Sequence, residues 1–348
     1  MYEDFHALMS RKRWRSRVHD YQSEERWRQL ERISMRSLEV MEVDTAPIPK
    51  FRLWPPNVQV VKNLLIRRQY DCAFDSESLL GIIKYLSGLE SISLETKPEI
   101  LAGLQLRRDF REYLQSSKSL KTLSIFFDNQ SLRTSEYDEH SPEPLVGDEL
   151  AHDTCLLEHL AVSFATDAIE FFQDLAQREA NGASLDQKLC TAADKKWQNL
   201  KSLVLTSTLL HPDFSDIMYG DVLLIAANAA AGMPSLRVME IWNHKHQHDE
   251  DKEVACVFRY RRVGSDSCPT IYFSNTWGGR LPLGVVRRWR KVARMHEGRH
   301  LRVSEQSLDL KGLGSKSCGS LIEHLDLHRL VLQPVSRCQL MWEHEMRR

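Results

Sequence analysis

The 348-residue sequence predicts an α/β protein in which short strands alternate with helices. Two observations support this prediction: the pattern apolar-x-x-apolar-x-apolar recurs along residues 61–241, and stretches with helical periodicity lie between its copies. The last two apolar positions of each copy are two residues apart, which is the spacing of side chains on one face of a strand. A single strand–helix unit cannot bury its apolar face alone, so neighbouring units must stack.

The pattern occurs in six copies, which begin at Val61, Leu89, Leu120, Leu157, Leu200 and Leu236. Their starts lie 28 to 43 residues apart, whereas regular leucine-rich repeats are roughly 20–29 residues long. The additional length falls in two polar insertions, residues 128–153 and 178–196, and we expect the acidic first insertion to be a mobile excursion. We therefore expect an irregular leucine-rich-repeat-like α/β arc. An ordinary α/β domain with several strand–helix units remains the alternative.

The charge pattern and the helical stretches agree with stacked units. The position after the first apolar residue is charged in all six copies. The stretch SESLLGIIKYLSG places Leu79, Ile82, Ile83 and Leu86 on one face, DAIEFFQDLAQREA has the same periodicity, and residues 222–231 are apolar nearly all round. These stretches predict the helices that return the chain from one strand to the next.

The pattern changes after Trp242, where the sequence predicts an α+β cap that closes the arc. Strands are expected at 253–263 and 269–277, a helix at 283–296, a third strand at 300–306, and a helical turn leading into a last strand within 321–332. The chain thus divides into a charged helical N-terminal segment (1–50), the arc (51–243) and the cap (244–348).

Composition excludes several classes of protein. The chain has 47 Lys and Arg against 48 Asp and Glu, so its formal net charge of −1 indicates neither a nucleic-acid nor a membrane partner. We expect no transmembrane helix and no secretion signal, because no apolar run is long enough and the first residues are strongly charged. The seven cysteines are scattered and form no CxxC pair, which is typical of reduced thiols in a cytoplasmic or nuclear protein.

Several segments resemble a known protein family. The segments GMPSLRVMEIWN (232–243), ACVFRYRR (255–262), SNTW (274–277) and VVRRWRKVARMH (285–296) are similar to the uncharacterised F-box-like proteins of filamentous fungi. Such proteins carry an irregular leucine-rich-repeat-like body and a C-terminal domain of unknown function. The resemblance covers roughly residues 27–310.

The resemblance implies a substrate receptor of a cullin ubiquitin ligase, with a protein partner on the repeat body and a Skp-type linker on an N-terminal F-box. The chain departs from that family where an F-box should begin, because no Leu-Pro and acidic helix start precedes Trp27. The segment 25–40 is therefore expected to be at most a truncated or degenerate F-box.

The histidine-rich segment IWNHKHQHDEDKEV raises the possibility of a metal site, and of a metal-dependent hydrolase as an alternative function. His244, His246 and His248 would lie on one side of an extended segment, and a histidine pair of this spacing can chelate zinc. A catalytic zinc site also needs supporting partners for each imidazole. We expect a polar loop between two strands and no metal or other cofactor.

The basic segment RRWRKVARMHEGRHLR raises a third possibility, nucleic-acid binding through the Arg287–Arg294 helix. However, Val285, Trp289, Val292 and His296 form one helical face, so the basic residues are expected to form the solvated face. The chain contains no nucleophile elbow, Walker loop or dinucleotide fingerprint. We therefore expect a non-enzymatic protein-interaction scaffold.

Two groups of residues are candidates for its function. The first comprises strand positions between the apolar ones, which could project toward a protein partner: Asn63, Ser93, Thr122, Ser124, Ala161, Ser202 and Val204. The second comprises Glu240, Trp242, Arg259 and Trp277, which we expect to hold the arc and the cap together. Arg259 alternates with Phe258 and Tyr260, so the arginine and the aromatic residues face opposite sides. If Arg259 faces inward it needs a carboxylate, and Glu240 on the neighbouring strand is the candidate.

Overall fold

The computed structural model describes most of the chain after residue 57. The described residues are 58–67, 76–96, 104–127, 147–173, 197–247, 252–262, 268–298, 300–310 and 317–346. The chain divides into two units, Met1–Pro56 and Asn57–Arg348, and every described residue belongs to the second. The expected N-terminal segment 1–50, with its possible F-box remnant, lies outside the described residues.

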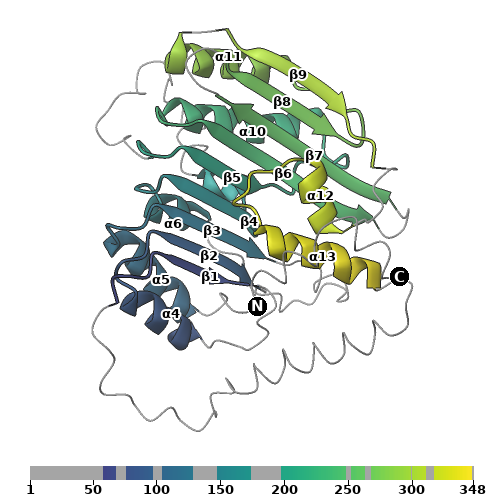
Figure 1. Cartoon of the computed structure of the whole chain (residues 1–348). Helices are drawn as coiled ribbons and strands as arrows, with labels where there is room; N and C mark the ends of the chain where they lie inside the picture. Colours follow the sequence, from purple (N-terminus) through teal and green to yellow (C-terminus); the bar gives the residue numbers. More distant parts are fainter. Residues whose placement is uncertain are drawn as a thin grey trace. The chain divides into compact units, whose positions relative to one another are not determined.

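The fold is mixed α/β, and the described residues form one nine-stranded sheet whose strands follow chain order (Figure 1). The strands are β1 (Asn63–Ile66), β2 (Ser91–Thr96), β3 (Thr122–Phe127), β4 (His159–Asp167), β5 (Ser202–Thr206), β6 (Val238–Gln247), β7 (Lys252–Arg261), β8 (Thr270–Asn275) and β9 (Arg302–Ser307). Strands β1 to β6 are parallel. Strand β7 is antiparallel to β6 and β8, and β9 is parallel to β8.

Helices cover both faces of this sheet. On one face, which we call the helical face, lie α4 (Ser76–Tyr85), α5 (Leu104–Ser116), α6 (Gly147–Asp153), α7 (Ala168–Phe171), α10 (Asp216–Ala231) and α11 (Leu283–Glu297) (Figure 1). On the other face lie α12 (Cys318–His324) and α13 (Pro334–Met346). We call residues 317–346 the C-terminal arm, and the side of the sheet that it covers the arm face.

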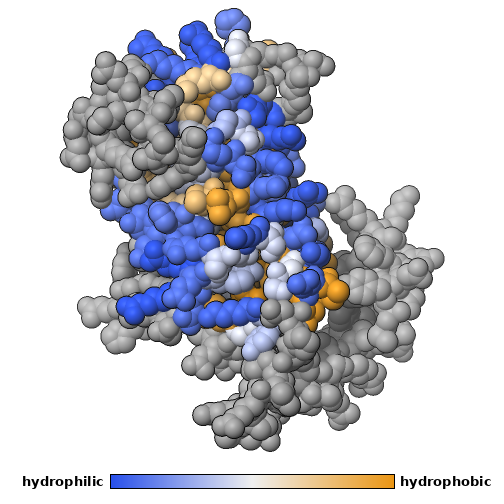
Figure 2. All heavy atoms as spheres, turned by 90° about the vertical axis from the view of Figure 1, so that its left-hand side faces the viewer, coloured by the Kyte–Doolittle hydropathy of each residue, from blue (hydrophilic) through white to orange (hydrophobic). Residues whose placement is uncertain are grey.

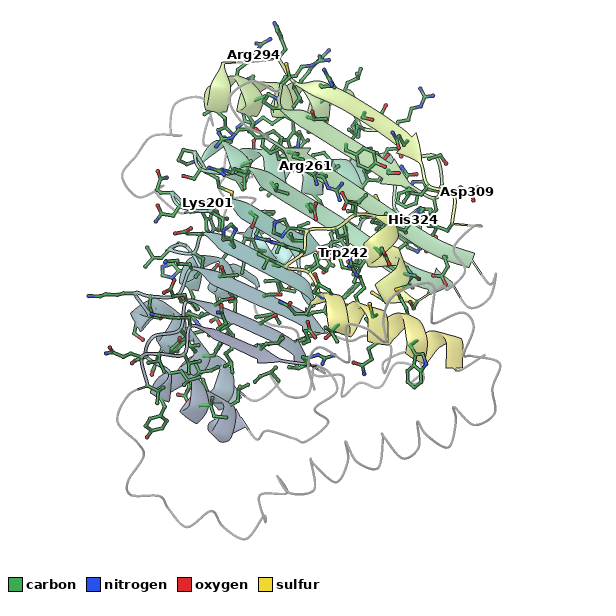
Figure 3. The ribbon with its side chains drawn as sticks, viewed as in Figure 1. Lys201, Trp242, Arg261, Arg294, Asp309 and His324 are labelled. Atoms are coloured by element: carbon green, nitrogen blue, oxygen red, sulfur yellow. The ribbon has the colours of Figure 1, made fainter. Side chains whose placement is uncertain are left out.

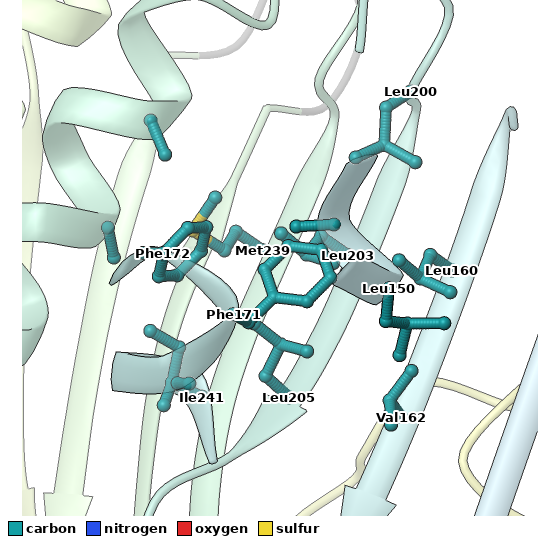
Figure 4. Close-up of a cluster of buried hydrophobic side chains, with 14 of the residues drawn as sticks. Leu150, Leu160, Val162, Phe171, Phe172, Leu200, Leu203, Leu205, Met239 and Ile241 are labelled. Atoms are coloured by element: carbon teal, nitrogen blue, oxygen red, sulfur yellow. The ribbon is translucent and has the colours of Figure 1, made fainter. Parts of the chain in front are cut away.

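The repeated apolar pattern forms six parallel strands, as predicted. The fourth position of every copy falls in one row across the sheet: Leu64, Ile92, Leu123, Leu160, Leu203 and Met239. The sixth position forms a second row: Ile66, Leu94, Ile125, Val162, Leu205 and Ile241. Both rows pack beneath the helices in one continuous core, and Figure 4 shows its middle part around Phe171 and Phe172.

The predicted helices are confirmed in α4, α10 and α11. Of the helix expected from residue 167, the described part contains the four-residue α7, which Asp167 caps by accepting a hydrogen bond from the amide of Ile169; residues 174–180 lie outside the described residues. Of the insertion 128–153, expected to be a mobile excursion, only the end is described, and it forms helix α6. Its Asp153 is buried and accepts a hydrogen bond of 2.6 Å from Arg111 of α5.

The C-terminal third forms the expected strands β7, β8 and β9 and the expected helix α11, but it ends differently. No strand lies within 321–332, where a final strand was expected; this segment contains the end of α12 and the turns that lead to α13. The predicted boundary between residues 243 and 244 falls inside β6, and the core continues from Met239 to Tyr260 and Trp289 beyond it.

Candidate protein-interaction surface

Side chains alternate between the two faces of the sheet, so every second residue of each strand faces the C-terminal arm. One row of such residues follows the amino ends of the strands: Asn63, Ser91, Thr122, His159, Ser202, Val238 and Arg261. A second row, two residues further along, comprises Leu65, Ser93, Ser124, Ala161, Val204, Glu240 and Arg259. The arm covers much of the second row.

A buried ion pair lies where the arm crosses the sheet. Glu240 and Arg259 are directly opposite in β6 and β7, and Arg259 Nε donates to Glu240 Oε1 at 2.6 Å. The predicted contact between these two residues is thus confirmed. Burial raises the pKa of Glu240, and the positive charge of Arg259 and a hydrogen bond from the amide of His328 oppose this shift.

Both members of this pair also bind the backbone of the arm. Arg259 Nη2 donates to the carbonyl oxygens of Leu325 at 2.8 Å and Asp326 at 2.7 Å. Glu240 Oε2 accepts a hydrogen bond from the amide of His328 at 2.8 Å. Charged groups this deeply buried need such partners, because an unpaired buried charge is strongly unfavourable. The pair therefore holds the arm in one register on the sheet.

Further contacts extend this attachment toward β2. Ser124 Oγ donates to the carbonyl oxygen of Leu330, and Glu95 Oε1 accepts a hydrogen bond from the amide of Gln333. Each contact joins a buried side chain of the sheet to a backbone group of the arm. These side chains satisfy polar backbone groups that the docked arm could not otherwise expose to water.

Apolar side chains complete the interface between arm and sheet. Trp242, Val204 and Val257 are fully buried against Leu321 and Val331 of the arm, and Figure 3 shows Trp242 beneath the crossing. A bulge at the end of β4 adds Phe164, whose φ of 61° is uncommon for a residue other than glycine. The Phe164 ring lies edge-on to Trp242, with their centroids 5.0 Å apart.

The seven predicted partner-binding positions divide between the two rows. Asn63 is exposed and Thr122 is half-buried, and both lie in the first row. The other five, Ser93, Ser124, Ala161, Ser202 and Val204, are buried. The C-terminal arm covers Ser124, Ala161 and Val204, and Ser202, in the first row, is buried beside His159. The strand pattern alone did not reveal the cover by the arm.

The first row and its surroundings contain further half-buried or exposed residues that were not predicted as partner-binding positions. His159 and Val238 are half-buried, while Arg261 and the neighbouring Arg237 and Arg329 are exposed. His159 Nδ1 lies 2.8 Å from Ser202 Oγ on the next strand. The signal that could have found His159 and Arg237 was present, since both lie between the apolar positions of the repeat. Arg329 could not be found this way, because it reaches this surface only through the arm.

The six charged positions of the repeat form a ladder at the amino ends of the strands. The ladder consists of Lys62, Glu90, Lys121, Glu158, Lys201 and Arg237, and each amide donates to the carbonyl oxygen of the preceding member. Lys62 and Lys121 both pair with Glu90, at 3.3 and 2.8 Å, and Lys201 pairs with Glu158 at 2.6 Å. Figure 2 shows this mostly hydrophilic side of the molecule.

The histidine-rich segment is a strand where a polar loop was expected. Strand β6 continues to Gln247, so His244 and His246 lie within a β-hairpin; His248 lies outside the described residues. The His244 side chain is buried, and its Nε2 lies 2.7 Å from Glu253 Oε2. Within the described ranges, no group of three His, Cys, Asp or Glu side chains could hold a metal ion.

The basic helix α11 packs as predicted. Val285, Trp289 and Val292 are fully buried, and Trp289 packs against Phe258 and Tyr260 of β7. The charged side chains of Arg287, Arg290, Lys291 and Arg294 are exposed on the opposite side of the helix. Of the two tryptophans expected to hold the arc and the cap together, Trp277 packs on the helical face and Trp242 on the arm face.

A comparison with models of protein families identifies the family of this chain. Residues 115–333 match the model of a family of unknown function (DUF6546), which covers more than half of the chain. The chain belongs to this family. The matched residues include Glu240, Arg259 and the arm as far as Gln333, whereas α13 lies beyond the match. No curated protein and no solved structure shows a significant match to the chain. No helix among the described residues is long and apolar enough to span a membrane.

Proposed function

We propose that this protein is a non-enzymatic protein-interaction scaffold with an irregular leucine-rich-repeat-like body. The observation that supports this best is the alignment of the repeated apolar positions in two rows across six consecutive parallel strands. Helices pack on one face of these strands, as in stacked strand–helix repeats. Repeat proteins of this kind bind partners on the extended face opposite their helices.

The partner would bind the part of the arm face that the arm leaves exposed, which is the first row along the amino ends of the strands. Asn63, Thr122, His159 and Arg261 lie there. Polar side chains at regular spacing along neighbouring strands suit an extended protein surface better than a small-molecule pocket. The partner would be a protein.

The resemblance to F-box-like proteins supports a more specific form of this proposal, a substrate receptor of a cullin ubiquitin ligase. Its linker-binding element would lie in residues 25–40, as a truncated or degenerate F-box. The protein would work inside the cell, in the cytoplasm or nucleus.

The test is affinity purification of the full chain from its native cells, with quantification of co-purified proteins. Substitutions Asn63→Arg and Thr122→Arg introduce bulky charges into the first row, and we expect them to remove the protein partner. Ser116→Arg, at an exposed position of α5 on the helical face, is the matched control and should retain it. Equal recovery from all three variants would contradict the proposed surface.

The same purification tests the link to ubiquitin ligases. We expect the Skp-type linker and the cullin to co-purify, and the first-row substitutions to leave both in place. Absence of linker and cullin, with the partner still present, would leave a scaffold without ligase attachment.

A further inference from the structure

The charge ladder at the amino ends of the strands is balanced at one end and unbalanced at the other. From Lys62 to Lys201 its signs alternate, so each acid lies beside a base. After Lys201 the alternation stops: the next member is Arg237, whose carbonyl oxygen accepts a hydrogen bond from the amide of Arg262. Lys201, Arg237 and Arg262 therefore follow one another beside the ends of β5, β6 and β7, where neighbouring strands lie about 5 Å apart.

Other basic groups surround this end of the ladder. Arg261 lies in the first row beside Val238, and Arg329 is brought to the same surface by the arm. Burial is the main cause that holds the pKa of His159 below its ordinary value, while Glu158 opposes the shift. Lys201, Arg329 and Arg237 lower it further, so all three charges act at His159.

Among the residues that the structure describes, few acids lie beside Lys201, Arg237, Arg261 and Arg329. Glu158 pairs with Lys201, and Asp326 lies 3.8 Å from Arg261 Nη2. Among the described residues, Arg237 and Arg329 have no ion-pair partner, and both are exposed. We call Lys201, Arg237, Arg261 and Arg329 the basic patch. A surplus of exposed positive charge in one area attracts ligands of the opposite sign.

We infer that the basic patch binds an extended acidic segment of the partner protein. This inference rests on the proposed function, because it assigns a chemistry to part of the same surface. The cations are spread over three strands rather than directed at one point. An extended peptide places every second side chain on one side, roughly 6.5–7 Å apart, so several carboxylates can meet the patch at once. A single phosphate group would reach only one or two of the cations.

The probe is a labelled peptide in which glutamate alternates with serine, titrated with the full-length protein in fluorescence anisotropy at low and high salt. We expect saturable binding at low salt that weakens as salt screens the charges. The double variant Arg237→Glu/Arg329→Glu should weaken binding by about tenfold or more, because attraction becomes repulsion at two sites. The matched control is Arg287→Glu/Arg290→Glu, which makes the same charge change on exposed α11 and should bind as the wild type does.

Four results would overturn the inference: no binding of the peptide at low salt, an equal loss in the α11 control, tighter binding of a single-stranded oligonucleotide of equal charge, or tighter binding of a peptide with one phosphoserine. Thermal melting of each variant shows whether it is folded.

The cellular purification separates this inference from the proposed function. If the cellular partner is lost with Thr122→Arg but kept with Arg237→Glu/Arg329→Glu, the proposed scaffold is supported and the acidic segment is contradicted. If the peptide binds the patch but no variant changes the recovery of cellular proteins, the patch stands and the proposed function fails.

Discussion

The two faces of the sheet are buried by different means. On the helical face, two rows of aliphatic side chains cross six strands and meet the apolar sides of the helices. On the arm face, the centre is an ion pair, Glu240 with Arg259, that binds backbone groups of the arm. The first interface is non-directional and repeats with every unit, whereas the second depends on a few directed hydrogen bonds.

The largest loss of stability is expected for the substitution Arg259→Met on the arm face. This change removes three hydrogen bonds and leaves the Glu240 carboxylate buried without its counter-ion, so it should lower the free energy of unfolding by about 3–5 kcal/mol. Urea denaturation measures this. Arg261→Met, two residues along the same strand and facing the same side but exposed, is the matched control and should change stability by less than about 0.5 kcal/mol. Similar effects of the two substitutions would mean that the buried pair does not hold the arm.

A second comparison uses two adjacent buried residues of β5 that face opposite sides. Leu203→Ala on the helical face should cost about 2–5 kcal/mol, because it removes contacts in the centre of the main core. Val204→Ala on the arm face should cost about 1.5–3 kcal/mol, because fewer methylene equivalents are lost.

Hydrogen exchange shows where each of these two substitutions acts. After Val204→Ala, amides of the arm should exchange faster than those of β4 and β5. After Leu203→Ala, all of these regions should lose protection together. Uniform loss in both variants would show that arm and sheet unfold as one unit.

The third prediction concerns pH and two histidines, one on each side of the sheet. Burial lowers the pKa of His296, on α11, to about 4, and it lowers the pKa of His328, in the arm, to about 4 as well. In the unfolded chain a histidine has a pKa of about 6.5, so the unfolded state takes up protons first as the pH falls. Stability that is present above pH 6.5 should therefore decrease between about pH 6.5 and 4.

His296→Gln should reduce this pH slope relative to the wild type in urea denaturation at pH 7.5 and pH 5. His328→Gln should do the same, and the comparison shows which side of the sheet contributes more. The exposed His324→Gln, in the same arm, is the control and should leave the slope as it is. If the pH slope of stability stayed the same in all three variants, the pH dependence could not be attributed to His296 and His328.

The smallest effect is expected from the charge ladder. Glu90→Gln removes both ion pairs of this exposed carboxylate, with Lys62 and Lys121. Because exposed pairs are screened by water and salt, unfolding should be nearly unchanged at moderate salt. A clear loss of stability would show that the ladder supports the fold, in addition to any role in binding.

Much of the helical face could be predicted from the sequence. The apolar spacing predicted the six strands, and the face of Val285, Trp289 and Val292 predicted how α11 packs. The pair of Glu240 and Arg259 could be predicted as a candidate contact, because an arginine that faces inward needs a carboxylate, although the alternation with Phe258 and Tyr260 did not decide which face the arginine takes. These features are local, and strand and helix periodicity report them directly.

The arm face could not be predicted in the same way. Residues 321–332 were expected to form a helical turn and a last strand; the helical turn is the end of α12, but the strand is absent. A short apolar run has no periodicity that separates a strand from turns packed on a core. The histidine segment was expected to be a loop on account of its polar residues, yet pairing with β7 extends β6 through His244 to Gln247. At the histidine segment, strand pairing outweighed local composition.

By itself, the sequence determined the six parallel strands, the rows of aliphatic side chains and the position of each charge in the ladder, because all of these follow from residue spacing along the chain. Only the tertiary structure decided that the C-terminal arm returns to cover Ser124, Ala161 and Val204, and that Arg329 joins Arg237 at the unbalanced end of the ladder. Contacts between residues so far apart in sequence depend on how the whole chain folds back on itself, and no local pattern encodes them.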